Sequence, residues 1–118
     1  MPLKVSGAFH SPLMAPAADG RGPALADSAF RDPVFPVIAN ATATPVRTGA
    51  DAARLLVAQL TAPVCWVESI RELALLAPGC RFIEIGPGTV LGGLLRRILP
   101  GADYLSLGTA AEVERFLA

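Results

Sequence analysis

Short apolar runs alternate with amphipathic segments along residues 81–118, and this alternation constrains the fold more than any other feature of the sequence. The runs RFIEIG (81–86) and DYLSLG (103–108) predict strands, and TVLGGLLRRILPG (89–101) and TAAEVERFLA (109–118) predict helices. Strands that alternate with helices pair in parallel, because the helix carries the chain back along the sheet. The segment therefore predicts an α/β layer with mostly parallel strands and flanking helices.

The residues before this segment continue the alternation less regularly. FPVIAN (35–40) predicts a short buried strand, TGADAARLLVAQL (48–60) predicts a helix, and PVCWVESIRELALLAPG (63–79) predicts a helix that opens at its first proline. Thr48 and Thr109 each precede an acidic residue by three positions, which is typical of a helix N-cap. Both helices therefore have a defined predicted start.

The segment SPLMAPAADGRGPALADSAF (11–30) is harder to interpret. Its apolar residues favour a helix, whereas Gly20, Gly22 and Pro23 oppose one. An interior proline costs about 3 kcal/mol and a glycine about 1 kcal/mol. We expect a helix that is broken near Gly20, or two short helices.

Composition and charge exclude several classes of function. The chain has 10 basic and 10 acidic residues among 118, so we expect neither a nucleic acid nor a membrane as partner. The start of the sequence is unlike a secretory signal, and Cys65 and Cys80 fit neither a disulfide framework nor a zinc site. We expect reduced thiols, no metal and a cytoplasmic protein. The hydrophobic content of 53% indicates either a missing partner surface or only the many alanines.

Four blocks of the sequence carry a resemblance to a known family. In chain order they are GAFHSPLMAPAA, FRDPVFPVIANATATPV, LLVAQLTAPVCWVESI and FIEIGPGTVLGGLLRRI, between about Val5 and Ile98. Together they resemble the C-terminal part of malonyl-CoA:acyl-carrier-protein acyltransferases and of the related domains in fatty-acid and polyketide synthases. The resemblance implies an α/β-hydrolase-like fold, with residues 1–118 as the C-terminal part of the large acyltransferase subdomain.

The resemblance also implies a chemistry. These enzymes transfer malonyl from malonyl-CoA to the phosphopantetheine thiol of an acyl carrier protein, through an acyl-serine and without a further cofactor. His10, the one histidine of the chain, matches the base that accepts the serine proton. Gln59 matches the glutamine whose carbonyl orients that base. Without the resemblance, a single histidine is more often structural and Gln59 is a polar position on a helix.

Three further residues are candidates for a substrate pocket. Phe9 stands in AFH, which accompanies malonyl selection in related modules, because a ring beside the base fills the space of an α-methyl group. The alternative is an ordinary core phenylalanine. Ser11 and Asn40 are the other two candidates, and for Asn40 we favour a role in a turn. The segment EIGPG (84–88) is interpreted mainly as a tight strand-to-helix connection, because its proline has no N–H for a phosphate.

Several parts of the family's machinery have no counterpart in these 118 residues. We find no G-H-S-x-G serine, no glutamine loop of the oxyanion hole and no arginine for the malonyl carboxylate, and nothing indicates that Arg54 or Arg81 replaces the last. The isolated chain is therefore predicted to be inactive, and its implied partners are malonyl-CoA, the carrier protein and the missing N-terminal part. The alternative is a non-catalytic remnant or a partner-binding module.

Overall fold

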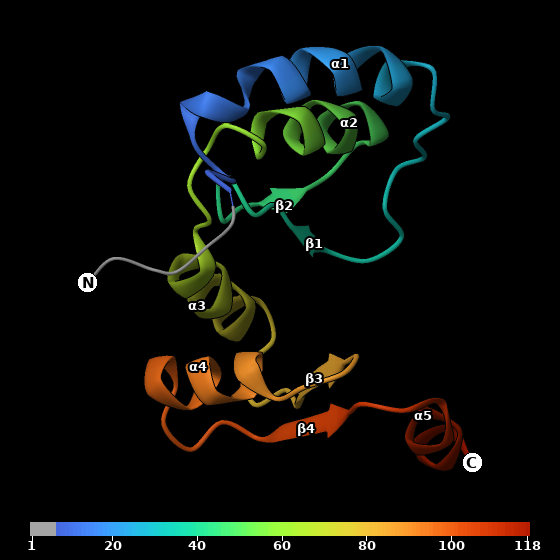
Figure 1. The fold of residues 1–118 in the computed structure, drawn as a ribbon. Helices are drawn as coiled ribbons and strands as arrows, with labels where there is room; N and C mark the ends of the chain where they lie inside the picture. Colours follow the sequence, from blue (N-terminus) through green and yellow to red (C-terminus); the bar gives the residue numbers. More distant parts are fainter. Residues whose placement is uncertain (1–6) are drawn as a thin grey trace. The chain divides into compact units, whose positions relative to one another are not determined.

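The computed structural model describes residues 7–118 and has a mixed α/β architecture (Figure 1). It divides into two compact units, the first extending to Ser69 and the second running from Ile70 to Ala118. The boundary falls within helix α3 (Trp66–Leu76). The first residues of the chain, 1–6, lie outside the described residues, so the resemblance is covered from Gly7, where its first block begins.

The first unit contains a short antiparallel strand pair and two helices that pack side by side (Figure 1). Val37 pairs with Val46, and a turn joins the two strands. Its elements are η1 (Pro12–Met14), α1 (Ala15–Ala26), β1 (Val37–Ile38), β2 (Pro45–Val46) and α2 (Gly49–Ala58).

The prediction of a buried strand over 35–40 is wrong in extent, burial and pairing. Only Val37–Ile38 is a strand, and the Phe35 side chain is 68% exposed. The strand pairs antiparallel with β2 because the connecting turn is too short for the crossover that parallel strands require. The expectation of mostly parallel strands therefore holds for one of the two described strand pairs.

The expected break in the first helix is also absent. Helix α1 runs from Ala15 to Ala26 without interruption, and Pro23 lies inside it. This proline removes one main-chain hydrogen bond, but the next turn closes normally, with Asp27 N donating to the Pro23 carbonyl at 3.0 Å. Packing of α1 on α2 offsets the unfavourable propensities, because tertiary contacts supply most of the stability of protein helices.

Helix α2 begins as predicted and helix α3 does not. The Thr48 hydroxyl accepts from Asp51 N at 3.1 Å, which confirms the N-cap. Helix α3 starts at Trp66 rather than at Pro63. Cys65 N donates to the Asn40 carbonyl at 2.9 Å, so this N–H bonds to another segment at the residue where the helix would otherwise continue backwards.

The second unit follows its predictions closely. Strands β3 (Phe82–Ile85) and β4 (Tyr104–Leu107) pair in parallel, with Ile83 opposite Leu105. Helix α4 (Val90–Ile98) connects them and α5 (Ala110–Leu117) follows β4. The predicted capping box of α5 is confirmed, with reciprocal bonds between Thr109 and Glu112.

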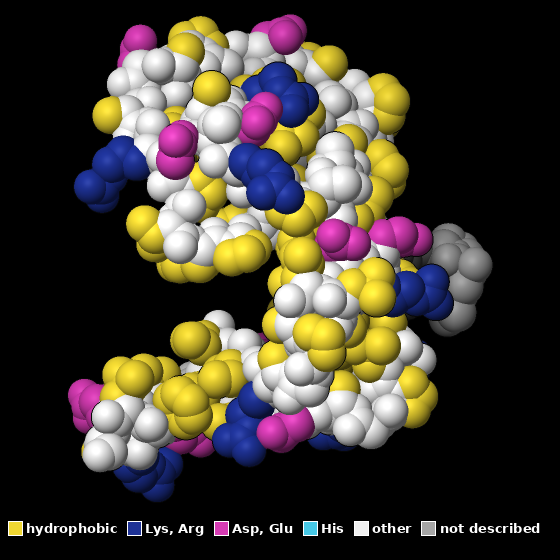
Figure 2. Space-filling model, turned by 180° about the vertical axis from the view of Figure 1, so that it is seen from behind, with side chains coloured by type: hydrophobic (Ala, Val, Ile, Leu, Met, Phe, Trp, Pro, Cys, Tyr) yellow, Lys and Arg dark blue, Asp and Glu magenta, His cyan; other side chains and the backbone are white. Residues whose placement is uncertain are grey.

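The core of the described residues is small. Among residues 7–118 no large side chain is completely buried, whereas many large apolar side chains are exposed, with Val34 at 94% and Ile85 at 72% (Figure 2). No described helix combines the length and the apolar character needed to cross a membrane. The buried apolar residues are Ala39, Ala43, Val46, Ile70, Leu95 and Leu107.

Candidate functional site

His10 lies in an exposed turn that leads into η1. Its φ angle is 57°, in the left-handed region that residues with a side chain rarely adopt. Such a conformation costs about 1–2 kcal/mol and persists only where surrounding contacts hold it. An outlier of this kind at a candidate catalytic position is typical of a functional constraint.

The imidazole of His10 contacts the end of helix α2. Its Nδ1 lies 2.8 Å from the main-chain oxygen of Gln59, a residue 49 positions away in sequence. Gln59 is the C-cap of α2, so its carbonyl is one of those that the helix leaves without an internal partner. A carbonyl only accepts, so Nδ1 carries the proton and the lone pair of the neutral ring is on Nε2.

The structure thus brings together the two residues predicted as base and orienting group. His10 contacts the main-chain oxygen of Gln59, not its side chain. Another residue type at position 59 with the same backbone would offer the same acceptor. The catalytic roles of His10 and Gln59 stay predictions.

Phe9 presents its ring to solvent. The side chain is 67% exposed, so the alternative of an ordinary core phenylalanine does not describe this structure. The ring lies over Gly7, where an added Cβ would come within 2.9 Å of the Phe9 ring. The absence of a side chain at Gly7 therefore allows this ring position, and the selectivity role of Phe9 stays a prediction.

Ser11 and Asn40 both have structural roles. The Ser11 hydroxyl donates to the Ala8 carbonyl at 2.6 Å and accepts from Leu13 N at 3.3 Å. Asn40 lies in the turn after β1, as the sequence predicted. Its carbonyl accepts from Cys65 N. The contribution of either residue to a substrate pocket stays a prediction.

A cavity of about 240 Å³ adjoins Gln59 in the first unit. Its walls come from β1, β2 and α2, and they are apolar except at Asn40 and Gln59. Asn40 thus lies both in the turn and at this cavity. The lining residues are Val37, Ile38, Ala39, Asn40, Val46, Ala52, Leu55, Leu56 and Gln59.

The EIGPG segment makes the tight connection that we predicted between β3 and α4. Gly86 and Gly88 have φ angles of 133° and 104°, which other residues rarely adopt. The Glu84 carboxylate accepts from Leu91 N at 3.3 Å and Gly92 N at 3.2 Å. These N–H groups are therefore occupied from within the protein, which argues against a phosphate site at this helix start.

Sequence reasoning missed this function of Glu84. Tyr104 also donates to its carboxylate, and that bond, followed by those from Gly92 and Leu91, holds the pKa of Glu84 below its usual value. The same bond raises the pKa of Tyr104. An acidic residue at an alternate position of an apolar strand was the available signal, because such a carboxylate needs partners.

Arg54 and Arg81 are each paired with a carboxylate. Arg54 Nη2 lies 3.1 Å from Asp51, and Arg81 Nε lies 2.7 Å from Asp103. Both pairs are exposed, so they contribute little to stability. Nothing in these contacts favours either arginine as the clamp for a malonyl carboxylate.

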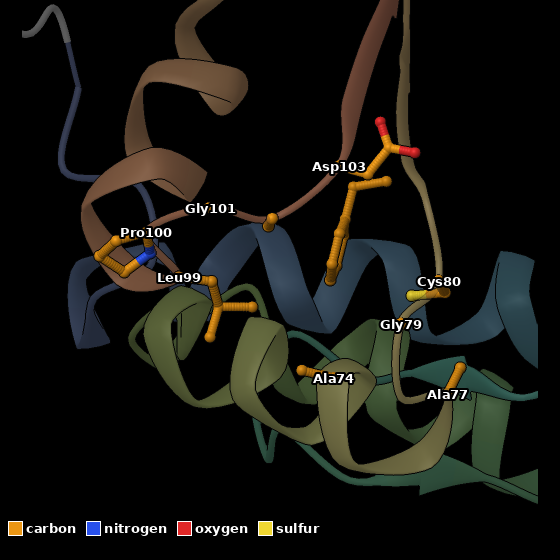
Figure 3. A pocket seen from close by; sticks show the side chains of 10 residues that line it. Ala74, Ala77, Gly79, Cys80, Leu99, Pro100, Gly101 and Asp103 are labelled. Atoms are coloured by element: carbon orange, nitrogen blue, oxygen red, sulfur yellow. The ribbon is translucent and has the colours of Figure 1, made fainter.

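A larger cavity of about 450 Å³ lies in the second unit, which contains none of the predicted site residues (Figure 3). It is lined by small side chains at the ends of α3 and α4, with the Cys80 thiol among them. Phe82 and Asp103 place it at the amino ends of the parallel strands. Open α/β sheets bind ligands at the carboxyl ends instead, so this cavity is not the expected place for catalysis.

Comparisons with known proteins identify the relatives of the chain. No family model matches it. It is 44% identical over 99 residues to the malonyl CoA-acyl carrier protein transacylase of Bacillus subtilis, covering 83% of this chain and 31% of that enzyme.

Solved structures agree with this relationship. The acyl-carrier-protein S-malonyltransferase of Bartonella henselae matches 98% of this chain and 36% of its own, with a TM-score of 0.87 and 40% identity. A malonyl-transacylase in complex with a type II PKS acyl-carrier protein matches 97% of this chain and 37% of its own, with a TM-score of 0.86 and 34% identity. The chain is therefore a homologue of the malonyl-CoA:acyl-carrier-protein transacylases that spans about a third of their length.

Proposed function

We propose that this chain supplies the general base of a malonyl-CoA:acyl-carrier-protein transacylase whose nucleophilic serine lies outside these 118 residues. The observation that carries the proposal is the 2.8 Å contact between His10 Nδ1 and the Gln59 carbonyl. The contact fixes the tautomer in which Nε2 is free to accept a proton. The left-handed backbone at His10 supports a functional constraint on the same residue.

The first half-reaction transfers the malonyl group to the serine. His10 Nε2 accepts the serine hydroxyl proton as the oxygen attacks the thioester carbon of malonyl-CoA. The tetrahedral intermediate collapses and the carbon–sulfur bond breaks. The departing CoA thiolate takes the proton from His10, and malonyl-serine remains.

In the second half-reaction His10 again accepts a proton from the nucleophile and returns it to the leaving group. His10 Nε2 accepts the proton of the phosphopantetheine thiol, and the sulfur attacks the ester carbon of malonyl-serine. The carbon–oxygen bond breaks, and the serine oxygen recovers the proton from His10. Throughout, the Gln59 carbonyl holds Nδ1–H and stabilises the imidazolium that forms in each half.

Relatives support the choice of substrates and partner. The related structure with a bound acyl-carrier protein is a malonyl-transacylase, so we assign the same partner class to this chain. Phe9, exposed beside His10, is assigned to the selection of malonyl over a branched acyl group. The free thiols of Cys65 and Cys80 fit a cytoplasmic location.

Complementation tests the proposal. The full chain is produced together with the part of the Bacillus subtilis enzyme that precedes its match to this chain, and transfer from malonyl-CoA to the carrier protein is followed by mass spectrometry. We expect turnover from the pair and none from either part alone. A covalent fusion in the family's order is assayed in parallel, so that weak association cannot hide activity.

The outcomes separate the proposal from its alternative. A folded complex or fusion without turnover overturns the proposed function and leaves a partner-binding module. Turnover that survives the replacement His10→Ala overturns the assignment of the base.

A further inference from the structure

The loop around His10 needs a device that holds it. His10 is exposed, its φ angle is 57°, and its imidazole bonds to the main-chain oxygen of Gln59. A loop free to relax would leave the left-handed region and carry the imidazole away from that carbonyl. Something next to His10 must therefore oppose this relaxation.

Ser11 provides two bonds across the loop. Its hydroxyl donates to the carbonyl of Ala8, at 2.6 Å, and accepts from the N–H of Leu13, at 3.3 Å. Ala8 precedes His10 and Leu13 follows it, so one oxygen atom joins the two sides of the turn. The second bond is also the N-cap of η1, which fixes the direction in which the chain leaves the site.

The same bonds argue against a direct contact of Ser11 with substrate. A serine hydroxyl has one proton, and here that proton is directed to the Ala8 carbonyl. Donation to a bound acyl group would require this bond to break, and the loop would lose half of its support. Ser11 thus acts on the backbone that carries His10.

We propose that Ser11 is a positioning residue whose hydroxyl, bonded to Ala8 and Leu13, keeps the His10 imidazole on the Gln59 carbonyl. Its effect on transfer rests on the proposed function, but its effect on the imidazole does not. Neutral histidine in water favours the tautomer with the proton on Nε2. Contact with the carbonyl reverses this preference, so the tautomer reports whether the loop is in place.

The chain is well suited to this measurement because His10 is its one histidine. Nitrogen-15 NMR of the full chain, at a pH where the ring is neutral, gives one pair of imidazole nitrogens and hence the tautomer. We expect the wild-type chain to hold the proton on Nδ1. The variant Ser11→Ala should shift most of the population to the Nε2–H form, and Ser11→Thr, which keeps the hydroxyl, should restore the wild-type spectrum.

Ser28→Ala is the matched control. Ser28 is an exposed serine in the same unit, and its hydroxyl also donates to a main-chain carbonyl, that of Ala24, at 2.9 Å. Its removal should leave the tautomer unchanged. If Ser11→Ala fails to fold, Ser11→Cys replaces it, because a thiol keeps the shape and is only a weak donor.

The outcomes are distinct from those of the proposed function. A wild-type tautomer in Ser11→Ala, or in Ser11→Cys where that variant replaces it, overturns the role of Ser11 and leaves the transacylase proposal intact. An equal shift in Ser28→Ala also overturns it, because the effect would then be general. In the complemented enzyme, Ser11→Ala should lower kcat about ten- to a hundredfold with little change in KM for malonyl-CoA.

Discussion

The loop that carries His10 and the connection between β3 and α4 are held in different ways. In the first unit a hydroxyl bridges main-chain groups of an exposed turn, and the site is completed by a carbonyl 49 residues away. In the second unit the Glu84 carboxylate joins neighbouring elements of a regular strand–helix–strand segment. The comparison sets a strained turn that carries the proposed base against a connection whose carboxylate joins elements of the fold.

The largest expected effect is on chemistry in the first unit. His10→Ala should lower turnover of the complemented enzyme by about 10²–10⁴-fold, the usual contribution of a general base. Stability should change little with it, because the side chain is exposed and alanine keeps the same backbone strain. His10→Gly should raise the free energy of unfolding by up to about 1 kcal/mol, since glycine adopts the left-handed region freely.

The measurement uses the single tryptophan. Urea unfolding followed by Trp66 fluorescence reports on the end of the first unit and on helix α3, which begins at Trp66. A clear loss of stability in both His10 variants would show that the residue is structural, and the contrast between the two regions would disappear.

A pair of adjacent glycines tests the second unit. An added Cβ at Gly92 would overlap the Tyr104 ring, whereas nothing lies within 4 Å of a Cβ at Gly93. Gly92→Ala should therefore destabilise the unit by about 1–3 kcal/mol through overpacking. Gly93→Ala, in the same helix, should stabilise it by up to about 1 kcal/mol because alanine favours the helix.

Unfolding followed by the fluorescence of Tyr104, the one tyrosine, checks both variants. Equal effects of the two substitutions would mean that helix propensity alone decides them. Close packing of α4 on β4 would then be excluded as the origin of the second unit's stability.

The second unit was largely predictable because its signals are local. Alternating apolar residues predicted both strands, Thr109 and Glu112 predicted the start of α5, and the EIGPG segment, with its proline, predicted the tight connection. The bonds of Glu84 were not predicted, since they depend on which residues the parallel register brings together. Local pattern therefore predicted the elements and left their side-chain contacts open.

In the first unit the fold was harder to predict than one contact of the candidate site. The resemblance led to His10 and Gln59, whose contact the structure contains. Propensity failed for α1, where packing on α2 offsets Pro23, and for β1, where a short turn imposes antiparallel pairing. The left-handed backbone at His10 had no signal, because no pattern of residue types encodes a strain held by Ser11 and Gln59.

A smaller effect is expected on selectivity. In Gly7→Ala the new Cβ would come within 2.9 Å of the Phe9 ring, so the ring must move away from its place beside the base. The preference of the complemented enzyme for malonyl over methylmalonyl should fall by about three- to tenfold, within the range of one methyl group. The control is Gly20→Ala, where nothing lies within 4 Å of the added group. An unchanged ratio of kcat/KM values would remove Phe9 from the selectivity argument.

The smallest expected effect concerns pH and the second unit. The bond from Tyr104 lowers the pKa of Glu84 and raises that of Tyr104. The part of the stability due to ionised Glu84 is fully present above about pH 4.5, the usual pKa of glutamate, and is lost as pH falls through the lowered pKa. For Tyr104 the sign is opposite: its part is present below about pH 10.0 and is lost as pH rises through the raised pKa.

Tyr104→Phe removes the hydroxyl that links the two titrations and leaves a ring under Arg96, which lies 5.9 Å from the ring centre. The variant should therefore be less stable near neutral pH and should lose less stability than the wild type toward both acid and alkali. Circular dichroism of urea unfolding between pH 3 and pH 11 measures how the free energy of unfolding changes toward acid and toward alkali. Glu84→Gln is the control that should remove the loss of stability toward acid. Parallel curves for wild type and Tyr104→Phe would show that the hydroxyl contributes equally at every pH. The second unit would then be held by its packing, and the carboxylate would serve only to cap α4.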